Sequence, residues 1–217
     1  MPKVSIIDYG IGNLFSVLKA CEFVGLNAEI TNDINRIMAS DALILPGVGA
    51  FKDAMANLNK LDLVGPIINF SKSGKPLMGV CLGMQLLLTE SEEFGKTKGL
   101  GIIKGVCKKF PFQNNGNNLK VPQINWNTIS PPYGSDKFEI NTPLEEIKKD
   151  SYMYFVHSYY ADLVSENEVL SNTKYGGIEY CSSIRKGNVF GFQFHPEKSG
   201  TDGLNIYKKL KEIINNK

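Results

Sequence analysis

The first part of the chain alternates between short apolar runs and amphipathic stretches. Residues 4–7 and 42–45 are continuous apolar runs, and a further one leads into Cys81. After the first run, apolar residues recur at the spacing of a helix face, at Leu14, Val17, Leu18, Cys21 and Val24. Asn13, just before them, is the expected N-cap of this helix. Buried strands divided by amphipathic helices predict a mostly parallel sheet covered on both faces, with ligands bound beyond the carboxyl ends of the strands. Cys81 lies at such an end.

Beyond about Gly99 the pattern changes to strand-like runs with fewer helices between them. These runs cover residues 102–110, 121–129, 152–160, 180–185 and 189–194. They predict a mixed or antiparallel portion added to the sheet in the C-terminal half, and residues 204–214 are expected to close the chain as a helix. With 42% hydrophobic and 21% charged residues among 217, the chain has enough apolar material for one domain over residues 1–217.

The charge balance argues against partners that are recognised by bulk charge. Lys and Arg number 24 and Asp and Glu number 22, so the formal net charge of +2 is too weak for nucleic acid or an anionic membrane surface. No apolar run approaches the roughly 20 residues of a membrane span, and the N-terminus does not have the pattern of a signal peptide. We therefore expect a cytoplasmic protein that binds neither nucleic acid nor a membrane.

Four cysteines and two histidines limit the metal and redox chemistry. The cysteines are far apart and contain no C-x-x-C pair, so we expect neither a metal site nor a disulfide framework, and no cofactor. Cys21, Cys107 and Cys181 lie inside helix-like or strand-like apolar patterns, where a cysteine acts as a small buried apolar residue. Cys81 is different, because it stands between two glycines where a strand becomes a helix.

A cysteine in a sharp strand-to-helix turn is exposed, lies at a helix N-terminus that favours the thiolate, and has free backbone N–H groups nearby for an oxyanion. Gly79 and Gly83 would let the backbone crowd into this turn and let the helix approach the sheet. The alternative is a buried cysteine in a glycine-rich packing turn. The turn at residues 46–49 also follows a strand, and it either presents a second N–H group near Cys81 or is an ordinary turn.

A thiolate that performs acyl transfer needs a base, and the chain has only His157 and His195. His195 follows an apolar strand, and in extended backbone Glu197, two residues on, would face the same side and orient the imidazole. His157 has no acidic residue two positions away, so it is the weaker candidate and is expected to be a supporting or core histidine. Cys81, His195 and Glu197 are therefore the predicted nucleophile, base and orienting carboxylate.

Six motifs together resemble a known family. GVCLGMQ at 79–85 and FHPEKS at 194–199 are similar to the class I, triad-type glutamine amidotransferases. DYGIGNL at 8–14, LPGVGAF at 45–51, VPQINWN at 121–127 and YFVHSY at 154–159 narrow the resemblance to the glutaminase subunits of imidazole glycerol phosphate synthase. The resemblance covers the chain from Val4 to the closing helix, and it implies the three-layer α/β fold of that class.

The resemblance also implies a reaction and the residues that perform it. Cys81 would attack the side-chain amide of L-glutamine, His195 would protonate the departing ammonia, and water would hydrolyse the thioester. The backbone N–H groups of Leu82 and of the Val48–Gly49 turn would hold the oxyanion. Four residues would bind the glutamine, namely Gln85, Glu93, Ser158 and Tyr159.

A partner is implied as well. Ammonia would pass to a (β/α)₈-barrel cyclase subunit, forming a heterodimer that makes imidazole glycerol phosphate and an aminoimidazole carboxamide nucleotide (AICAR) in histidine biosynthesis. Trp126, Tyr154 and Lys198 match positions at that interface. A glutaminase without its acceptor would waste glutamine, so we expect low activity from the isolated chain and stimulation by an occupied partner.

The sequence departs from the family pattern at two places, and other interpretations remain open. Asn125 replaces the glycine of the family's Gly-Trp-Asn, and residues 175–181 are an unusual version of their segment. We expect both departures to lie near the face that binds the partner. The alternatives are a related glutaminase subunit that supplies ammonia for amidination of a surface-polysaccharide sugar, a non-catalytic regulatory subunit on the same fold, and a cysteine peptidase.

Overall fold

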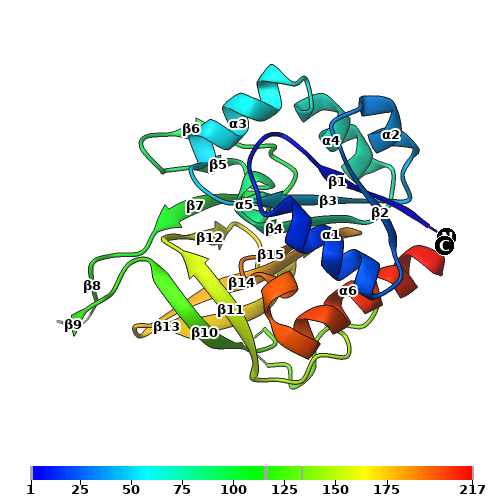
Figure 1. Cartoon of the computed structure of the whole chain (residues 1–217). Coiled ribbons are helices and arrows are strands. Elements are labelled where there is room, and N and C mark those ends of the chain that lie inside the picture. The colour runs from blue at the N-terminus through cyan, green and yellow to red at the C-terminus, as the bar shows by residue number, and fades with distance from the viewer. Residues whose placement is uncertain (1, 115–116, 133, 217) are drawn as a thin grey trace.

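The strands of the N-terminal half form the parallel part of one central sheet. In the computed structural model, β1 (Lys3–Ile7), β2 (Asn27–Thr31), β3 (Ala42–Gly47) and β4 (Leu77–Cys81) lie in the order β2-β1-β3-β4 with all neighbours parallel (Figure 1). The structure describes residues 2–114, 117–132 and 134–216, so the two terminal residues of the predicted 1–217 domain lie outside it.

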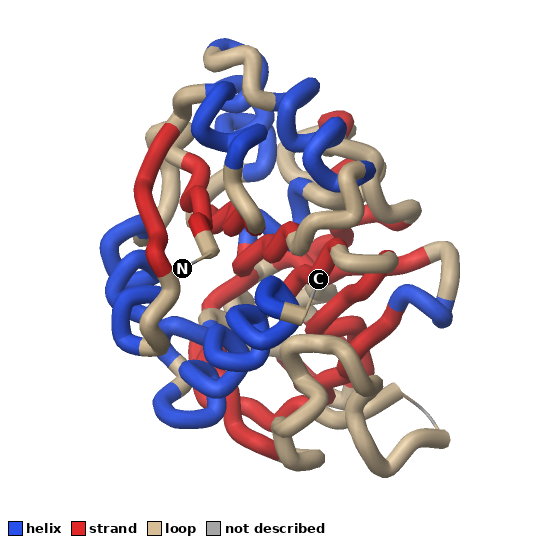
Figure 2. Tube along the Cα trace, turned by 90° about the vertical axis from the view of Figure 1, so that its right-hand side faces the viewer, coloured by secondary structure: helices blue, strands red, loops and turns tan. Residues whose placement is uncertain are grey.

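Helices cover both faces of this sheet, and alternation along each strand sends side chains to both. The helices are α1 (Leu14–Phe23), α2 (Ile34–Ala39), α3 (Phe51–Lys60), α4 (Val64–Lys72), α5 (Leu82–Leu86) and α6 (Gly200–Asn215). Ile44 packs in the same apolar cluster as α1 and α6, whereas its neighbour Leu45 packs in the cluster of α2, α3 and α4. The side view also shows the strands between two groups of helices (Figure 2).

The C-terminal half adds antiparallel strands to the same sheet. First, β15 (Val189–Phe192) pairs in parallel with β4. Three strands then follow in antiparallel succession: β14 (Ile178–Lys186), β12 (Tyr159–Leu163) and β7 (Gly105–Lys109). The remaining elements of this sheet are the short β5 (Glu90–Ser91) and β6 (Thr97–Lys98) beyond β7, and β13 (Val169–Tyr175), which pairs with β14. The predicted three-layer α/β fold with a mostly parallel sheet and an antiparallel addition is confirmed.

A separate two-stranded ribbon carries two of the sequence motifs. Its strands are β10 (Gln123–Ile129) and β11 (Ser151–His157), paired antiparallel with Trp126 opposite Tyr154. The smaller elements are the hairpin strands β8 (Gln113–Asn114) and β9 (Asn117–Asn118) and the 3₁₀ helices η1 (Glu166–Glu168) and η2 (Pro196–Lys198).

Two predicted strands differ from the structure, and one observed strand was not predicted. The run at 152–160 is two strands, because the chain leaves the ribbon at Ser158, whose carbonyl accepts the Phe110 N–H at 3.0 Å, and then enters the central sheet as β12. The run at 102–110 is a strand only from Gly105, since the N–H groups of Ile102 and Ile103 both bond to the Leu87 carbonyl at 3.0 Å. The mostly polar β13 was not predicted.

The expected helix cap at Asn13 and the three expected buried cysteines are present. Asn13 caps α1, its side-chain oxygen accepting the Ser16 N–H at 3.3 Å. Cys21, Cys107 and Cys181 are all buried, as predicted.

The turn from β4 to α5 is packed backbone against backbone. A Cβ atom built on Gly83 would overlap the carbonyl oxygen of Leu45 in β3, and one on Gly79 would come within 2.8 Å of the backbone of Gly83. A side chain at either position would push α5 away from the sheet. This is the close approach that the two glycines predict.

Replacing Gly83 by alanine should therefore destabilise the protein. We expect Gly83→Ala to lower the free energy of unfolding by about 2 kcal/mol or more, because the atom it strikes is backbone and cannot rotate away. Urea denaturation followed by circular dichroism measures this. Gly65→Ala is the matched control, because a Cβ there meets nothing within 4 Å in helix α4 and should change stability by less than about 1 kcal/mol. Equal stability of the two variants would contradict the packing argument.

Candidate active site

Cys81 occupies a strained position at the carboxyl end of β4. Its backbone has φ 54° and ψ −111°, a conformation that residues other than glycine rarely adopt and that costs about 1–3 kcal/mol. It is also the N-cap of α5, so its sulfur lies beside the unpaired N–H groups of a helix start. The strain is the geometry of a nucleophile elbow. The expectation of an exposed thiol was wrong, because Cys81 is buried with 6% of its surface exposed, although it borders a cavity.

One cavity of about 240 Å³ collects Cys81 and the residues expected around it. Its lining includes all seven residues predicted to hold the oxyanion or the substrate: Val48, Gly49, Leu82, Gln85, Glu93, Ser158 and Tyr159. Pro122, Val156 and His157 complete it. Segments far apart in the sequence therefore meet at a single small space next to the thiol.

His195 and Glu197 form a buried pair beside this cavity. The Nδ1 atom of His195 lies 2.8 Å from Oε1 of Glu197, and both side chains are almost entirely buried. The predicted contact is present, but its geometric reason was wrong. Glu197 is not in extended backbone, because it belongs to the 3₁₀ helix η2, whose N-cap is His195.

The ribbon holds this histidine in place. The backbone N–H of His195 donates to the Tyr154 carbonyl at 2.9 Å, and the backbone N–H of Tyr154 donates to the Ser199 hydroxyl at 3.0 Å. Strand β11 and the η2 turn are thus joined on both sides of the histidine. A displacement of the ribbon would be transmitted directly to the imidazole.

The surroundings of His195 favour its protonated form. Burial lowers the pKa of His195, but the hydrogen bond and charge of Cys81, followed by those of Glu197, raise it more strongly, to about 10. Its Nε2 atom is buried without an ordinary hydrogen-bond partner among the described residues. The group that acts on this side of the ring is the Cys81 sulfur, which also lies 3.8 Å from the Val156 carbonyl oxygen.

His157 has a different environment. Its Nδ1 donates to the Tyr159 carbonyl at 2.8 Å, and its Nε2 lies 3.2 Å from the Tyr180 hydroxyl. The pKa of His157 is lowered to about 4, mainly by burial. The hydrogen bond to Tyr159 raises this pKa, and the charge of His195 lowers it further. His157 is therefore a neutral supporting histidine with both nitrogens engaged.

Two of the predicted substrate residues already make internal bonds. The Gln85 amide donates to the Tyr159 carbonyl at 3.0 Å and to Oε1 of Gln193 at 3.0 Å. Glu93 accepts the Phe51 N–H at 2.6 Å at the start of α3. The sequence analysis predicted neither the role of Gln193 nor the hydrogen bond between Glu93 and the Phe51 N–H. The only signal in the sequence was that Gln193 lies two residues before His195.

The turn after β3 has a backbone conformation that favours glycine. Gly49 has φ +94°, which favours glycine, and Val48 is partly exposed. The Tyr9 hydroxyl donates to the Pro46 carbonyl at 2.7 Å and ties the end of β3 to the loop after β1. Leu82, which borders the same cavity, is the first residue of α5.

The predicted interface residues lie together near one surface. The rings of Trp126 and Tyr154 pack edge to face with centroids 6.0 Å apart, Trp126 is half exposed, and Lys198 is exposed on η2. Ile124 and Tyr152 are also exposed on the ribbon.

The two departures from the family pattern meet at one buried glutamine. The amide nitrogen of Gln123 donates to the Asn125 side chain at 3.1 Å, and its oxygen accepts from the Tyr180 hydroxyl at 3.0 Å. Since neutral His157 also offers an acceptor at 3.2 Å, the single hydroxyl hydrogen of Tyr180 has two acceptors. Asn125 is exposed on the ribbon and Tyr180 is buried beneath it, while Gly176, Gly177 and Glu179 of the second departure are exposed. That both departures lie near the partner face stays a prediction.

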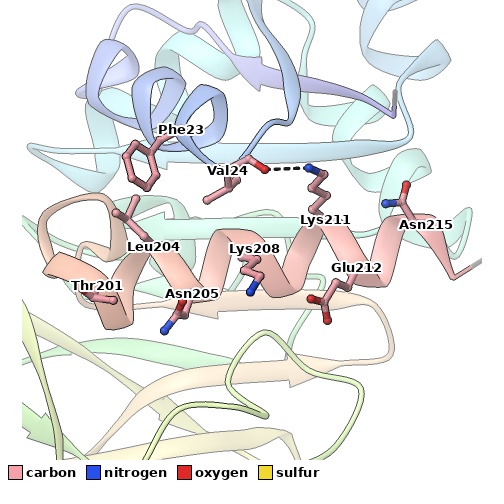
Figure 3. A pocket seen from close by; sticks show the side chains of 9 residues that line it. All are labelled: Phe23, Val24, Thr201, Leu204, Asn205, Lys208, Lys211, Glu212 and Asn215. Carbon is pink, nitrogen blue, oxygen red and sulfur yellow. Dashed lines mark hydrogen bonds between the residues drawn. The ribbon is translucent and has the colours of Figure 1, made fainter.

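A second cavity has no comparable chemistry. It lies between the end of α1 and helix α6, has a volume of about 460 Å³, and is lined by Phe23, Val24 and seven residues of α6 (Figure 3). Lys211 crosses it to donate to the Val24 carbonyl at 2.9 Å. Its lining contains neither cysteine nor histidine.

Metal-binding clusters and membrane-spanning helices are absent from the part of the chain that the structure describes. Within residues 2–114, 117–132 and 134–216, no cluster of three or more His, Cys, Asp or Glu side chains has the arrangement of a metal site. Over the same described part of the chain, no helix has the length and apolarity needed to cross a bilayer.

Comparison with known proteins agrees with the geometry. Residues 5–211 match the family described as class-I glutamine amidotransferase. Two solved structures, a glutamine amidotransferase and PurLQS from Thermotoga maritima, share the fold with TM-scores of 0.72 and 0.70 at 17% and 20% identity. The first comparison covers 98% of both chains, and the second 99% of this chain and 98% of the other. The chain belongs to the class-I glutamine amidotransferases.

Closer relatives place it more narrowly. The chain is 46% identical to the imidazole glycerol phosphate synthase subunit HisH of Methanosarcina acetivorans, over 98% of this chain and 100% of the relative. It is 42% identical to HisH of Geobacter sulfurreducens over the same shares. Within its class, the protein is a glutaminase subunit of the HisH family.

The two histidines should titrate far from their usual range. We expect NMR titration to find neither imidazole changing protonation between about pH 5.5 and 8.5, because the pKa of His157 is about 4 and that of His195 about 10. Glu197→Gln should lower the pKa of His195, since it removes the charge that stabilises the imidazolium. A His157→Gln variant assigns the signals. A midpoint near 6.5 for either histidine would contradict the described electrostatics.

Proposed function

We propose that Cys81, His195 and Glu197 hydrolyse L-glutamine through a thioester intermediate. The observation that carries this proposal is the convergence of a strained cysteine, a buried histidine–carboxylate pair and seven predicted site residues around one cavity. The cavity volume of about 240 Å³ suits a small amino acid better than a polypeptide, which speaks against a peptidase.

In the first half-reaction, the Cys81 sulfur attacks the amide carbon of glutamine. The C=O electron pair moves onto the oxygen, and the backbone N–H groups of Leu82 and of the Val48–Gly49 turn stabilise the oxyanion. When this intermediate collapses, the C–N bond breaks and the nitrogen takes the proton from Nε2 of His195. Ammonia leaves, and the glutamyl group remains on Cys81 as a thioester.

In the second half-reaction, the neutral His195 takes a proton from water, and the oxygen attacks the thioester carbon. The C–S bond then breaks, releasing glutamate and restoring the thiolate and the imidazolium. Glu197 keeps the ring oriented and compensates its charge throughout.

The glutamine is proposed to bind through Gln85, Glu93, Ser158 and Tyr159. The Glu93 carboxylate suits the α-ammonium group, because a carboxylate that already accepts one N–H has capacity for further donors. Gln85 and the Ser158–Tyr159 segment border the same space.

We further propose that the ammonia passes to a (β/α)₈-barrel cyclase subunit in a cytoplasmic heterodimer. The ribbon is the proposed docking surface, because Ile124, Trp126 and Tyr152 leave an apolar area exposed there, beside Lys198. The names of the relatives as subunits of imidazole glycerol phosphate synthase support this partner. Since His195 bonds to the ribbon, binding there can act on the catalytic pair.

The triad proposal is tested by removing the thiol. We expect Cys81→Ala to lower glutamine hydrolysis by at least about a thousandfold, because Cys81 is the only cysteine among the described residues that line the cavity, while the fold is kept. Glutamate release and circular dichroism measure the two effects. Cys21→Ala, which changes a buried cysteine of the α1 layer, is the control and should retain activity. Retention of activity by Cys81→Ala would end the proposal.

The partner proposal is tested by glutamate release from the purified chain, alone and with the histidine-pathway cyclase subunit plus its nucleotide ligand. We expect low activity alone and at least about tenfold stimulation by the occupied cyclase. Trp126→Ala should weaken the stimulation, whereas Phe23→Ala, an exposed aromatic change on α1, should not. Without binding or stimulation, the acceptor must be sought elsewhere, with a surface-sugar amidination system tested next.

A further inference from the structure

Gln193 is a buried polar residue between β15 and the catalytic histidine. Its side chain has no exposed surface, and its backbone N–H donates to the Ser182 carbonyl at 2.9 Å. Burying an amide is costly unless its polar atoms are bonded, so the partners of this side chain indicate why it is there.

The two ends of the Gln193 amide meet two residues of the site. Its Oε1 accepts from the Gln85 amide nitrogen at 3.0 Å, and its Nε2 lies 3.8 Å from the Cys81 sulfur, within hydrogen-bonding range for sulfur. Gln193 thus joins the nucleophile to a residue of the proposed glutamine site.

The orientation of the Gln193 amide follows from hydrogen-bond logic. The Tyr159 carbonyl can only accept, so the Gln85 atom that bonds to it is the nitrogen. The second hydrogen of that nitrogen needs an acceptor, which is the Gln193 oxygen. Turning the Gln193 amide over would place two donors against each other. The N–H group of Gln193 is therefore forced to point at the Cys81 sulfur.

A fixed N–H donor beside a sulfur stabilises the thiolate over the thiol. Several titratable groups also act on this sulfur: His195 across the triad, Tyr9 from the loop after β1, and Cys107 from β7. Glu93 and His157 border the same cavity. Gln193 differs from all of these because its amide does not titrate, so its dipole acts on the sulfur at every pH.

We propose that Gln193 is a further catalytic residue, which donates its side-chain N–H to the Cys81 thiolate and links that thiolate to Gln85. The role at the sulfur needs only the contacts just described, whereas the link to substrate rests on the proposed function.

The test is the pH dependence of Cys81 alkylation by iodoacetamide, with glutamine hydrolysis measured in parallel. Gln193→Met keeps the length of the side chain but removes the N–H, so the midpoint of alkylation should move upward by about half a pH unit or more. Half a unit corresponds to roughly a threefold loss of thiolate below the midpoint, and kcat should fall at least as much. Cys21, Cys107 and Cys181 are buried with raised pKa values, and a Cys81→Ala background corrects for them.

Controls separate this role from a structural one. Gln113→Met makes the same change on the exposed strand β8 and should leave the midpoint unchanged. Gln193→Asn keeps an amide that is one methylene too short to reach the sulfur, so it should also raise the midpoint, and it serves if Gln193→Met does not fold. An unchanged midpoint in a folded Gln193 variant would overturn the proposal. A shifted midpoint in a protein that does not hydrolyse glutamine would uphold the role of Gln193 at the sulfur while the proposed function fails.

Discussion

The contact between Gly83 and the carbonyl of Leu45 is the constraint on which the site depends. It presses α5 against β3, so the chain must turn sharply between β4 and α5. Cys81 stands at that turn and takes the strained backbone that the turn imposes. The same approach places Leu82 and the Val48–Gly49 turn around one small cavity. A packing requirement between two backbones thus puts the largely buried Cys81 thiol at the edge of this cavity, beside the proposed oxyanion site.

The second organising feature is a set of shared hydrogen bonds around the Tyr159 carbonyl. This oxygen accepts from both His157 and Gln85, and so it joins two buried polar groups. From Gln85 the bonds continue through Gln193 to the Cys81 sulfur. From His157 they continue through Tyr180 and Gln123. A buried polar group without partners is costly, so each member of this set restricts the others. The set ends at Asn125 on the exposed ribbon, where a partner is proposed to bind.

The ribbon also offers a route by which the proposed catalytic histidine can respond to an event at the surface. His195 is bonded through its ring to Glu197 and through its backbone to Tyr154 on β11. The imidazole is therefore positioned by two elements, the η2 turn and the ribbon. The apolar side chains exposed on that ribbon are what a bound subunit would cover, which provides a short physical route between docking and catalysis.

The sequence by itself determined the fold class, the position of Cys81 after a buried strand, and the identity of the histidine and carboxylate beside it. Periodicity, glycine spacing and motifs are local properties of the chain, so they can be interpreted without coordinates. Only the tertiary structure decided that the run at 152–160 divides between two sheets, that Glu93 caps α3, and that Gln193 touches the nucleophile. These facts depend on which distant segments pack together. A single polar side chain carries no sign of its partner until the fold has placed the two side by side.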